Sequence, residues 1–324
     1  MAVYTQLSAE KLAQLVAQYD VGDLVSAKGI AEGVSNSNWF IETTGSEANG
    51  KRFILTMYER RIDVAELPFF LGLLDHLAAR GCPVPRTIHD LEGASHRKVG
   101  GKAVALIEFL PGVSVDRPTP AQARAVGTVL ARMHLAAMDF PGTRANDLGP
   151  QVSARVLADC GEAALAAIDP GLPAMIETAQ AVASAWPEGL PQSIIHSDLF
   201  PDNVLIMGDR VSALIDFYFA CNDAMAYDLA VTHAAWSFGS DGANYRPEVG
   251  HALVKGYESQ RPLEDDERKA LPMLAQGAAL RFISSRAQDW IETPADALVT
   301  RKDPMDFARR LEFYRREGKD VFGL

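Results

Sequence analysis

The sequence predicts an α+β fold of two lobes, a small N-terminal lobe with an antiparallel sheet and a larger, mainly helical C-terminal lobe. The chain has 324 residues, which suggests about two domains at roughly 100–200 residues each. Strand-like runs fill the first third of the chain, and helical periodicity dominates the rest. A Leu-Pro-Gly turn at 110–112 separates the two regions, so the predicted lobes are 1–109 and 110–324.

A helix and a three-stranded meander are predicted at the start of the small lobe. Ser8 is a suitable N-cap, and the apolar residues that follow recur at helical spacing: Leu12, Leu15, Val16 and Tyr19. Apolar runs then predict three strands, of which one ends at Ile30 and the others cover Trp39–Thr43 and Arg52–Tyr58. The connecting turns fall at Gly33–Asn38 and at Gly50.

A second helix and a further strand complete the small lobe. Helical spacing predicts a helix over Asp63–Arg80. Gly81 is expected to end this helix, and Pro83 and Pro85, which follow, cannot continue it. The apolar run after this helix predicts a strand over Ala103–Phe109.

Helices dominate the predicted large lobe. The pattern predicts three helices, over Pro120–Met138, Ala154–Ala167 and Pro173–Ala185. Two short apolar runs follow, Asn203–Met207 and Ser212–Phe217, and helices are predicted from there to the end. The acidic run Glu264–Glu267 is expected at a helix start, where negative charge suits the helix dipole.

Composition excludes several classes of function. Lys and Arg number 31 against 42 Asp and Glu, a net charge of −11, which repels nucleic acids and anionic membranes. The three cysteines are widely spaced and predict neither a disulfide framework nor a zinc site. The same cysteine usage fits a reducing cytoplasm. No leader or membrane-length apolar segment stands out, so we expect a protein that is neither exported nor embedded in a membrane. The sequence does not indicate an oligomeric state.

One segment carries most of the chemical information. His196, Asp198 and Asn203 form the pattern H-x-D-x-x-x-x-N between apolar runs, and an Ile-Asp-Phe tripeptide follows with Asp216 at its centre. A lone His-x-Asp is usually accidental, but this longer pattern is typical of the catalytic loop and metal-binding segment of phosphoryl-transfer enzymes.

Each residue type in this pattern suits one step of phosphoryl transfer. Asp198 is the candidate base that holds an acceptor hydroxyl and takes its proton. Asn203 and Asp216 offer the oxygen ligands that Mg²⁺ prefers, while His196 is expected to brace the loop. We expect Asp198 and Asp216 to converge on one crevice.

Further motifs resemble the aminoglycoside phosphotransferase and choline kinase superfamily, whose members are relatives of protein kinases. Segment 223–230 resembles its Asp-Pro…Asp-Leu-Ala motif, with Ala224 where Pro is usual, and 130–134 resembles its Leu-x-x-Leu-His helix. The resemblance implies a bilobal protein-kinase-like fold. It also implies that Asp223 and Asp228 order the loop after the metal ligand and that His134 supports the catalytic loop.

Within this superfamily the sequence resembles the homoserine kinases. Segment 32–40 resembles their nucleotide loop, and 52–59 resembles the strand that follows. The resemblance implies phosphorylation of L-homoserine to O-phospho-L-homoserine, a step toward threonine, with ATP and Mg²⁺. The implied nucleotide-loop residues are Gly33, Val34, Ser35, Asn36, Ser37 and Asn38.

The remaining nucleotide contacts rest on the same resemblance. Adenine is expected along the lobe-connecting segment, at Glu108, Phe109 and Leu110. The strand position that commonly holds a phosphate-binding Lys is Thr56, as homoserine kinases carry it. Lys51, Arg60 or Arg61 could supply the missing charge, or Mg²⁺ and the N–H groups of the loop could suffice. Glu66 could then lack its usual ion-pair partner.

The acceptor site needs a cation if the acceptor carries a carboxylate. Arg281 and Arg286 are the candidates beside Asp198, and their spacing of five places only one of them toward the substrate. A choline, aminoglycoside or other amino-alcohol kinase is the first alternative, since a cationic acceptor would need carboxylates instead. A nucleotide-binding pseudokinase is the second alternative, and Thr56 is the feature that favours it.

Overall fold

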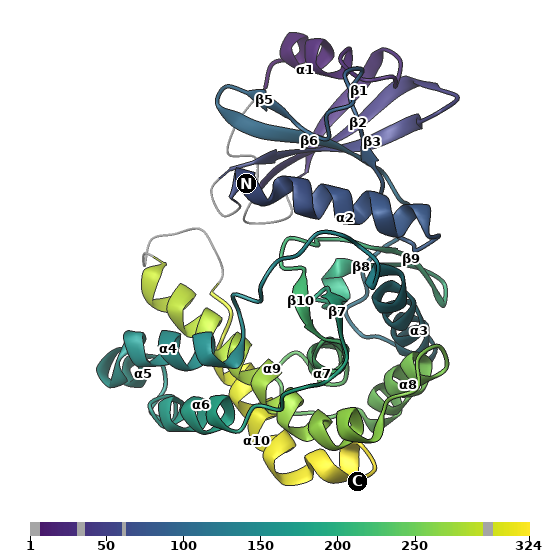
Figure 1. Cartoon of the computed structure of the whole chain (residues 1–324). Helices are drawn as coiled ribbons and strands as arrows, with labels where there is room; N and C mark the ends of the chain where they lie inside the picture. The colour runs from purple at the N-terminus through teal and green to yellow at the C-terminus, as the bar shows by residue number, and fades with distance from the viewer. Residues whose placement is uncertain (1–6, 31–35, 60–62, 294–300) are drawn as a thin grey trace. The chain divides into compact units, whose positions relative to one another are not determined.

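The computed structural model describes residues 7–30, 36–59, 63–293 and 301–324. The chain forms two compact units (Figure 1). Unit 1 holds Met1–Gly112, Phe140–Gly142 and Ser212–Tyr218, and unit 2 holds Val113–Asp139, Thr143–Val211 and Phe219–Leu324. The first segment of unit 1 ends with the Leu-Pro-Gly turn at 110–112. Two later segments of the chain, Phe140–Gly142 and Ser212–Tyr218, also belong to unit 1.

Unit 1 is built on an antiparallel sheet in the order β1-β2-β3-β6-β4, with β5 also paired to β6. Its elements are α1 (Ala9–Val16), β1 (Leu24–Ile30), β2 (Asn36–Ser46), β3 (Gly50–Tyr58), η1 (Val64–Glu66), α2 (Leu67–Ala79), β4 (Thr87–Ile88), β5 (Arg97–Val99) and β6 (Lys102–Glu108). The predicted meander, both helices and the strand at Ala103–Phe109 are therefore confirmed.

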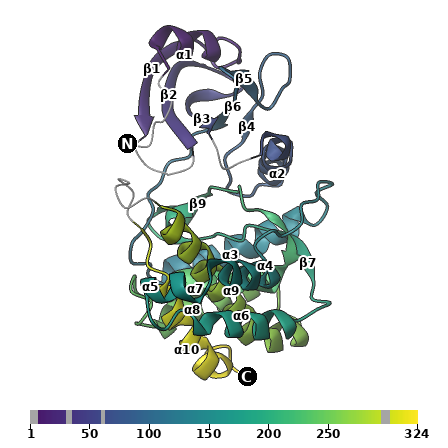
Figure 2. The same cartoon turned by 90° about the vertical axis from the view of Figure 1, so that its left-hand side faces the viewer.

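Two helices cover the two faces of this sheet, as Figures 1 and 2 show for α1 and α2. Leu12 and Leu15 of α1 belong to the same buried cluster as Leu55. Leu67 of α2 packs with Ala105 on the opposite face. Successive side chains of a strand alternate between faces, so each strand contributes to both cores.

Unit 1 differs from its prediction at the first turn and at two short strands. β2 already begins at Asn36, so residues 36–38 are strand and not turn; Gly33, Val34 and Ser35 lie outside the described residues. Sequence reasoning missed β4 and β5 because strands of two and three residues are too short to show alternation.

Unit 2 is mainly helical, with a short antiparallel pair, β7 and β10, beside the helices. Its elements are α3 (Pro120–Ala137), α4 (Pro150–Cys160), α5 (Glu162–Ile168), α6 (Ala174–Ser184), β7 (Gln192–Ile195), η2 (Pro201–Asn203), β8 (Val204–Met207), β10 (Cys221–Ala224), α7 (Met225–Trp236), α8 (Pro247–Glu258), α9 (Asp265–Glu292) and α10 (Met305–Val321). β8 pairs with β9 (Arg210–Leu214), which begins in unit 2 and ends in unit 1.

Two predictions for this unit were wrong in detail. The helix expected over Ala154–Ala167 is two helices, because Gly161 adopts a φ of 77° that breaks the first one. β7 and β10 were missed, since these four-residue strands are recognisable only by their pairing with each other.

The acidic helix start was predicted correctly. Glu264 is the N-cap of α9 and forms a capping box with Glu267. Glu267 is fully buried and accepts hydrogen bonds of 2.9 and 3.0 Å from Arg261. Among the described helices, none has the length and apolar content needed to cross a membrane.

Candidate active site in unit 2

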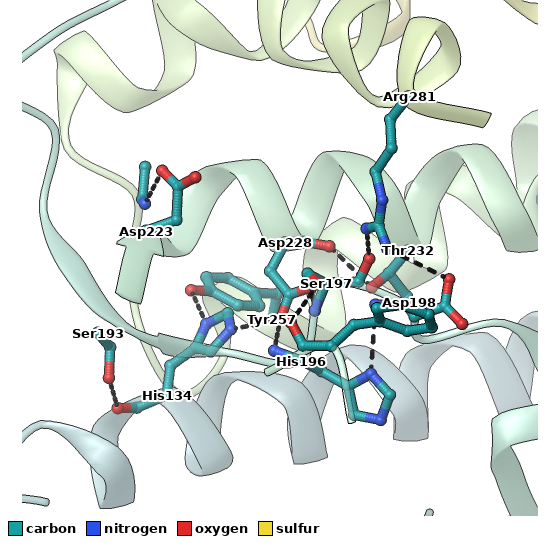
Figure 3. A network of polar contacts seen from close by, with 12 residues as sticks. His134, Ser193, His196, Ser197, Asp198, Asp223, Asp228, Thr232, Tyr257 and Arg281 are labelled. Carbon is teal, nitrogen blue, oxygen red and sulfur yellow. Dashed lines mark hydrogen bonds and ion pairs between the residues drawn. The ribbon is translucent and has the colours of Figure 1, made fainter. Parts of the chain in front are cut away.

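The H-x-D-x-x-x-x-N segment is positioned by the strand that precedes it. β7 ends at Ile195, which pairs with Cys221 of β10, and the chain then turns into His196. The 3-10 turn η2 follows and places Asn203 directly before β8. We call residues 196–203 the catalytic loop; Figure 3 shows the polar contacts around its start.

A buried carboxylate holds the beginning of the catalytic loop. Asp228 of α7 accepts hydrogen bonds from the backbone N–H groups of His196, at 2.7 Å, and Ser197, at 2.8 Å. Burial raises the pKa of the Asp228 carboxyl, but hydrogen bonding and attraction to His134, together with attraction to His196, outweigh burial and keep this pKa below its ordinary value. Asp228 is therefore the charged anchor of the loop.

His134 of α3 supports this anchor from behind, as the resemblance implied. Its Nε2 lies 2.9 Å from Asp228 Oδ2, and its Nδ1 lies 2.8 Å from the hydroxyl of Tyr257 (Figure 3). Ser193 Oγ donates to the carbonyl of His134 at 2.7 Å. α3, α8 and β7 thus converge on the same buried network.

The roles implied for Asp223 and Asp228 differ from the contacts observed. Asp228 orders the catalytic loop itself. Asp223 accepts a hydrogen bond of 2.6 Å from Asn146 Nδ2 and is the penultimate residue of β10, two positions before the start of α7. Sequence reasoning could not make this distinction, because both residues belong to one motif but contact different segments.

Ser197 adopts a backbone conformation that is unusual for a residue with a side chain. Its φ is 60°, in the left-handed region, which costs roughly 1–2 kcal/mol for a non-glycine residue. Its N–H donates to Asp228, its Oγ donates to the carbonyl of Phe219 at 2.8 Å, and its carbonyl accepts from Arg281 Nη1. Three different segments therefore fix this residue.

Asp198 presents its carboxylate beside an amide and a guanidinium. Asn203 Nδ2 lies 2.8 Å from the carbonyl of Asp198 and 3.3 Å from its Oδ2. These two acceptors fix the amide orientation, so the Asn203 Oδ1 is turned away from Asp198. Arg281 Nη2 lies 3.6 Å from Asp198 Oδ1.

His196 braces the loop from inside. His196 is completely buried, and its Nδ1 accepts a hydrogen bond of 3.3 Å from the backbone N–H of Asp198. The Asp198 side chain, by contrast, is 19% exposed. Of these two residues, Asp198 is the one that a substrate can reach.

The two arginines of α9 differ in their contacts. Arg281 binds the catalytic loop, whereas Arg286 Nη1 donates to the carbonyl of Asp303 at 2.8 Å and to Asp306 Oδ2 at 3.1 Å. Burial lowers the pKa of the Arg286 guanidinium, and the carboxylates of Asp306, Asp303 and Asp198 oppose this shift. Both arginines are thus within electrostatic range of Asp198.

Asp216 belongs to unit 1, unlike the catalytic loop, and has its own strained backbone. Its φ is 64°. Two residues later the hydroxyl of Tyr218 lies 2.9 Å from that of Tyr58, and burial, then Tyr58 and Asp216, raise the pKa of the Tyr218 phenol. The expected convergence of Asp198 and Asp216 remains a prediction.

The predicted nucleotide-loop residues within the described chain lie at the start of β2. Asn36 pairs with Tyr58 and Asn38 pairs with Thr56 of β3. Ser37 Oγ donates to Glu59 Oε1 at 2.6 Å, and Glu59 also forms an ion pair with Lys102. Sequence reasoning missed this pair because Glu59 and Lys102 are 43 positions apart.

This ion pair does not replace the missing strand lysine directly. Lys102 lies two positions before Val104 in β6, and Val104 pairs with Met57, so Lys102 shares a sheet face with Met57 and not with Thr56, the neighbour of Met57 in β3. Lys51 is exposed and lies beside the β2–β3 turn, because its Cγ would be 2.5 Å from a Cβ placed on Gly45. Arg60 and Arg61 lie outside the described residues.

The segment expected to bind adenine is tied into unit 1. The N–H of Glu108 donates to the carbonyl of Arg86 at 2.9 Å, and the N–H of Phe109 donates to that of Arg52 at 3.2 Å. Glu108 Oε2 lies 3.3 Å from Arg86 Nε. Leu110 follows at the end of this segment and is partly buried.

The sequence is similar to a known protein family and to curated relatives. The sequence matches the phosphotransferase enzyme family over residues 26–266. It is 48% identical to a homoserine kinase of Acidiphilium cryptum (strain JF-5), with 98% of each chain covered. It is 49% identical to a homoserine kinase of Caulobacter sp. (strain K31), with 100% of this chain and 99% of the relative covered.

Solved structures similar to this chain have little sequence identity to it. A spectinomycin phosphotransferase in complex with ADP and spectinomycin has a TM-score of 0.68 at 14% identity, with 96% of this chain and 95% of that chain covered. Choline kinase from Cryptosporidium parvum Iowa II has a TM-score of 0.65 at 13% identity, with 92% and 90% covered. These similarities confirm the predicted protein-kinase-like fold.

Proposed function

The chain belongs to the phosphotransferase enzyme family, and we propose that it transfers the γ-phosphoryl group of ATP to the side-chain hydroxyl of L-homoserine. The products are O-phospho-L-homoserine and ADP, and the phosphorylated amino acid is a precursor of threonine. One observation carries the choice of substrate: the relatives named homoserine kinase are 48% and 49% identical to this chain over nearly its whole length.

Asp198 is the group proposed to act on the acceptor. Its carboxylate is partly exposed, while His196, Asn203 and Asp228 hold the loop around it. A carboxylate in this position orients the hydroxyl and takes its proton as the new oxygen–phosphorus bond forms and the bond to ADP breaks. The fixed loop supports this role because a pre-positioned base avoids reorganisation during the reaction.

The oxygen atoms of Asn203 and Asp216 are the proposed ligands of Mg²⁺. Asn203 Oδ1 is turned away from Asp198, and an amide oxygen and a carboxylate form a hard donor set. No cluster of three His, Cys, Asp or Glu side chains suited to a metal occurs in the described parts of the chain. That fits an ion that takes its remaining ligands from water and nucleotide phosphates. When bound, Mg²⁺ would offset negative charge on the phosphates.

The nucleotide is proposed to bind unit 1. The start of β2, with Asn36, Ser37 and Asn38, follows the loop that resembles a nucleotide loop. Glu108, Phe109 and Leu110 are proposed to meet adenine through backbone groups other than the two N–H donors already engaged.

An acceptor panel tests the proposed function. Purified protein is incubated with ATP, Mg²⁺ and either L-homoserine, choline or kanamycin, and the phosphorylated product is identified by ³¹P NMR and mass spectrometry. We expect turnover of L-homoserine and phosphate attached to its side-chain oxygen. Turnover of only choline or kanamycin would overturn the choice of substrate, and ADP formation without any phosphorylated acceptor would overturn the transferase assignment.

A further inference from the structure

Arg281 has two possible roles in a kinase whose acceptor carries a carboxylate. It could bind the substrate, or it could hold the catalytic loop. We infer that Arg281 is a positioning residue that keeps Ser197 in its left-handed conformation and thereby aims the Asp198 carboxylate. This inference rests on the proposed phosphotransferase function of the loop.

The contacts of the Arg281 guanidinium favour the loop. Nη1 donates to the carbonyl of Ser197, and Nη2 lies 3.6 Å from Asp198 Oδ1 (Figure 3). The guanidinium therefore spans two consecutive residues and touches both the strained one and the catalytic one. A planar group with several fixed donors is suited to this, because it sets the direction of both partners at once.

Burial separates Arg281 from the surface that a substrate would use. Its side chain is 4% exposed, compared with 19% for the Asp198 side chain. The guanidinium carbon lies 4.8 Å from the ring centroid of Phe282 and 5.6 Å from that of Phe219. Two aromatic rings therefore pack near the cation, which restricts its orientation and its access to a ligand.

Ser197 explains why the loop needs such a contact. Its φ of 60° is disfavoured for serine, so the conformation persists only because surrounding groups determine it. The N–H and Oγ of Ser197 are held by Asp228 and by the carbonyl of Phe219. Arg281 holds its carbonyl, the polar group that adjoins Asp198. Loss of this contact would release the carbonyl side of the peptide between Ser197 and Asp198, whose N–H donates to His196 Nδ1 at 3.3 Å, and would let the orientation of this peptide shift.

Arg286 provides the matched comparison. It lies five residues further along α9 and carries the same functional group, but its hydrogen bonds go to Asp303 and Asp306. Its side chain is 13% exposed, more than that of Arg281. If one arginine of α9 binds the substrate carboxylate, the greater exposure of Arg286 favours that residue.

A double-mutant cycle between Arg281 and Ser197 tests the inference. Glycine adopts the left-handed region without strain, so Ser197→Gly removes the need for an external group to enforce it. We expect Arg281→Gln to lower kcat about 100-fold, the loss typical of a small misplacement of a catalytic group, while the KM for the acceptor changes by less than about 3-fold. In the Ser197→Gly background the same substitution should lower kcat by about 10-fold or less.

Controls separate positioning from substrate binding and from simple loss of structure. Arg286→Gln should show no such coupling with Ser197→Gly, because the hydrogen bonds of Arg286 go to Asp303 and Asp306 and not to Ser197. Arg281→Lys keeps the charge and one donor group, so it should recover part of the lost kcat and gives a second variant if Arg281→Gln does not fold. Circular dichroism and the denaturant midpoint monitor folding of every variant.

The inference is overturned if Arg281→Gln raises the acceptor KM with little change in kcat, or if its effect on kcat is the same with Ser197 and with Gly at this position. The cycle is run with whichever acceptor the panel identifies. A protein that phosphorylates another alcohol would refute the proposed substrate and would still decide the role of Arg281.

Discussion

Strain at single residues marks both segments that carry the proposed chemistry. Among the described non-glycine residues, positive φ angles occur only at Ser197 and Asp216. Ser197 is the middle residue of the H-x-D motif, and Asp216 is the middle residue of the Ile-Asp-Phe motif. Such conformations persist where neighbouring groups over-determine them, and they concentrate at functional sites. The backbone therefore distinguishes these two segments independently of side-chain chemistry.

Substitution of Asp198 tests the proposed base directly. Asp198→Asn keeps the size of the side chain but removes its negative charge and the group that takes the proton. We expect kcat to fall by about 100-fold or more, while the Kd for ATP measured by calorimetry stays close to the wild-type value. Near-normal turnover would refute the assignment of Asp198 as the base.

Substitution of Asp228 tests the anchor of the catalytic loop. An Asn side chain keeps one acceptor oxygen but directs an NH₂ group at donors, so Asp228→Asn should cost about 3–5 kcal/mol of unfolding free energy, as for other broken buried pairs. Asp223→Asn, at a partly exposed carboxylate of the same motif, should cost much less. Equal losses in urea denaturation would contradict the anchor role.

The difference in unfolding free energy between wild type and Asp228→Asn should depend on pH in a defined way. The folded pKa of Asp228 is lowered, so its stabilising contribution is present above the unfolded pKa of about 3.9 and is lost as the pH falls through the folded value. The difference in unfolding free energy between wild type and Asp228→Asn should therefore shrink only below about pH 4. A difference that disappears between pH 7 and pH 5 would be inconsistent with this carboxylate as its source.

At the scale of elements, two glycines allow α3 and α8 to pack closely. A Cβ on Gly127 would lie 2.0 Å from the carbonyl oxygen of Leu253, and a Cβ on Gly256 would lie 2.1 Å from that of Arg124. These helices carry His134 and Tyr257, which meet at 2.8 Å behind the catalytic loop. The close approach of two helices thus sets the distance between two side chains of the site.

An alanine at this crossing should separate the helices. We expect Gly256→Ala to lower the unfolding free energy by about 1–3 kcal/mol, the usual cost of overpacking, and to lower kcat because the His134 support shifts. Gly72→Ala in α2 is the control: the nearest atom to its Cβ would be 3.9 Å away, so helix propensity should stabilise the protein by up to about 1 kcal/mol. Equal effects in thermal denaturation would contradict the close-packing argument.

At the scale of the whole molecule, a buried histidine makes stability sensitive to mild acid. His233 is fully buried in α7, and its Nδ1 lies 2.7 Å from the hydroxyl of Tyr314. Burial, and then the charge of His251, lowers the pKa of His233 to about 3. The unfolded chain binds this proton near the ordinary pKa of about 6.5, so the folded state loses stability as the pH falls from about 6.5 toward 3.

Replacement of His233 isolates this contribution. Between pH 6.5 and 4.5 the wild-type unfolding free energy should fall by up to about 1.4 kcal/mol per pH unit from this residue alone, and His233→Gln should have a shallower slope. His89→Gln should act in the opposite direction, because hydrogen bonds to the Gly93 carbonyl and to Asp75 raise the pKa of His89. Parallel wild-type and His233→Gln profiles would exclude His233 as the acid-sensitive group.

Local patterns in the sequence were sufficient for much of this molecule. The first helix, the capped start of α9 and most strands of the unit 1 sheet depend on residues close together in the chain. The H-x-D-x-x-x-x-N motif likewise indicated a kinase, because its chemistry requires those residue types within one loop. Short strands such as β10 escaped prediction because their pairing partner is distant in the sequence.

The arrangement around the catalytic loop was decided by tertiary structure. Asp228 reaches the loop from 30 residues beyond Asp198, and Arg281 reaches it from α9. Neither contact has a local signal, since a buried carboxylate or guanidinium finds its partner only when helices pack and exclude water. The sequence by itself determined which functional groups the chain possesses; packing determined which of them hold the loop and which remain accessible to a substrate, because burial is a property of the assembled core.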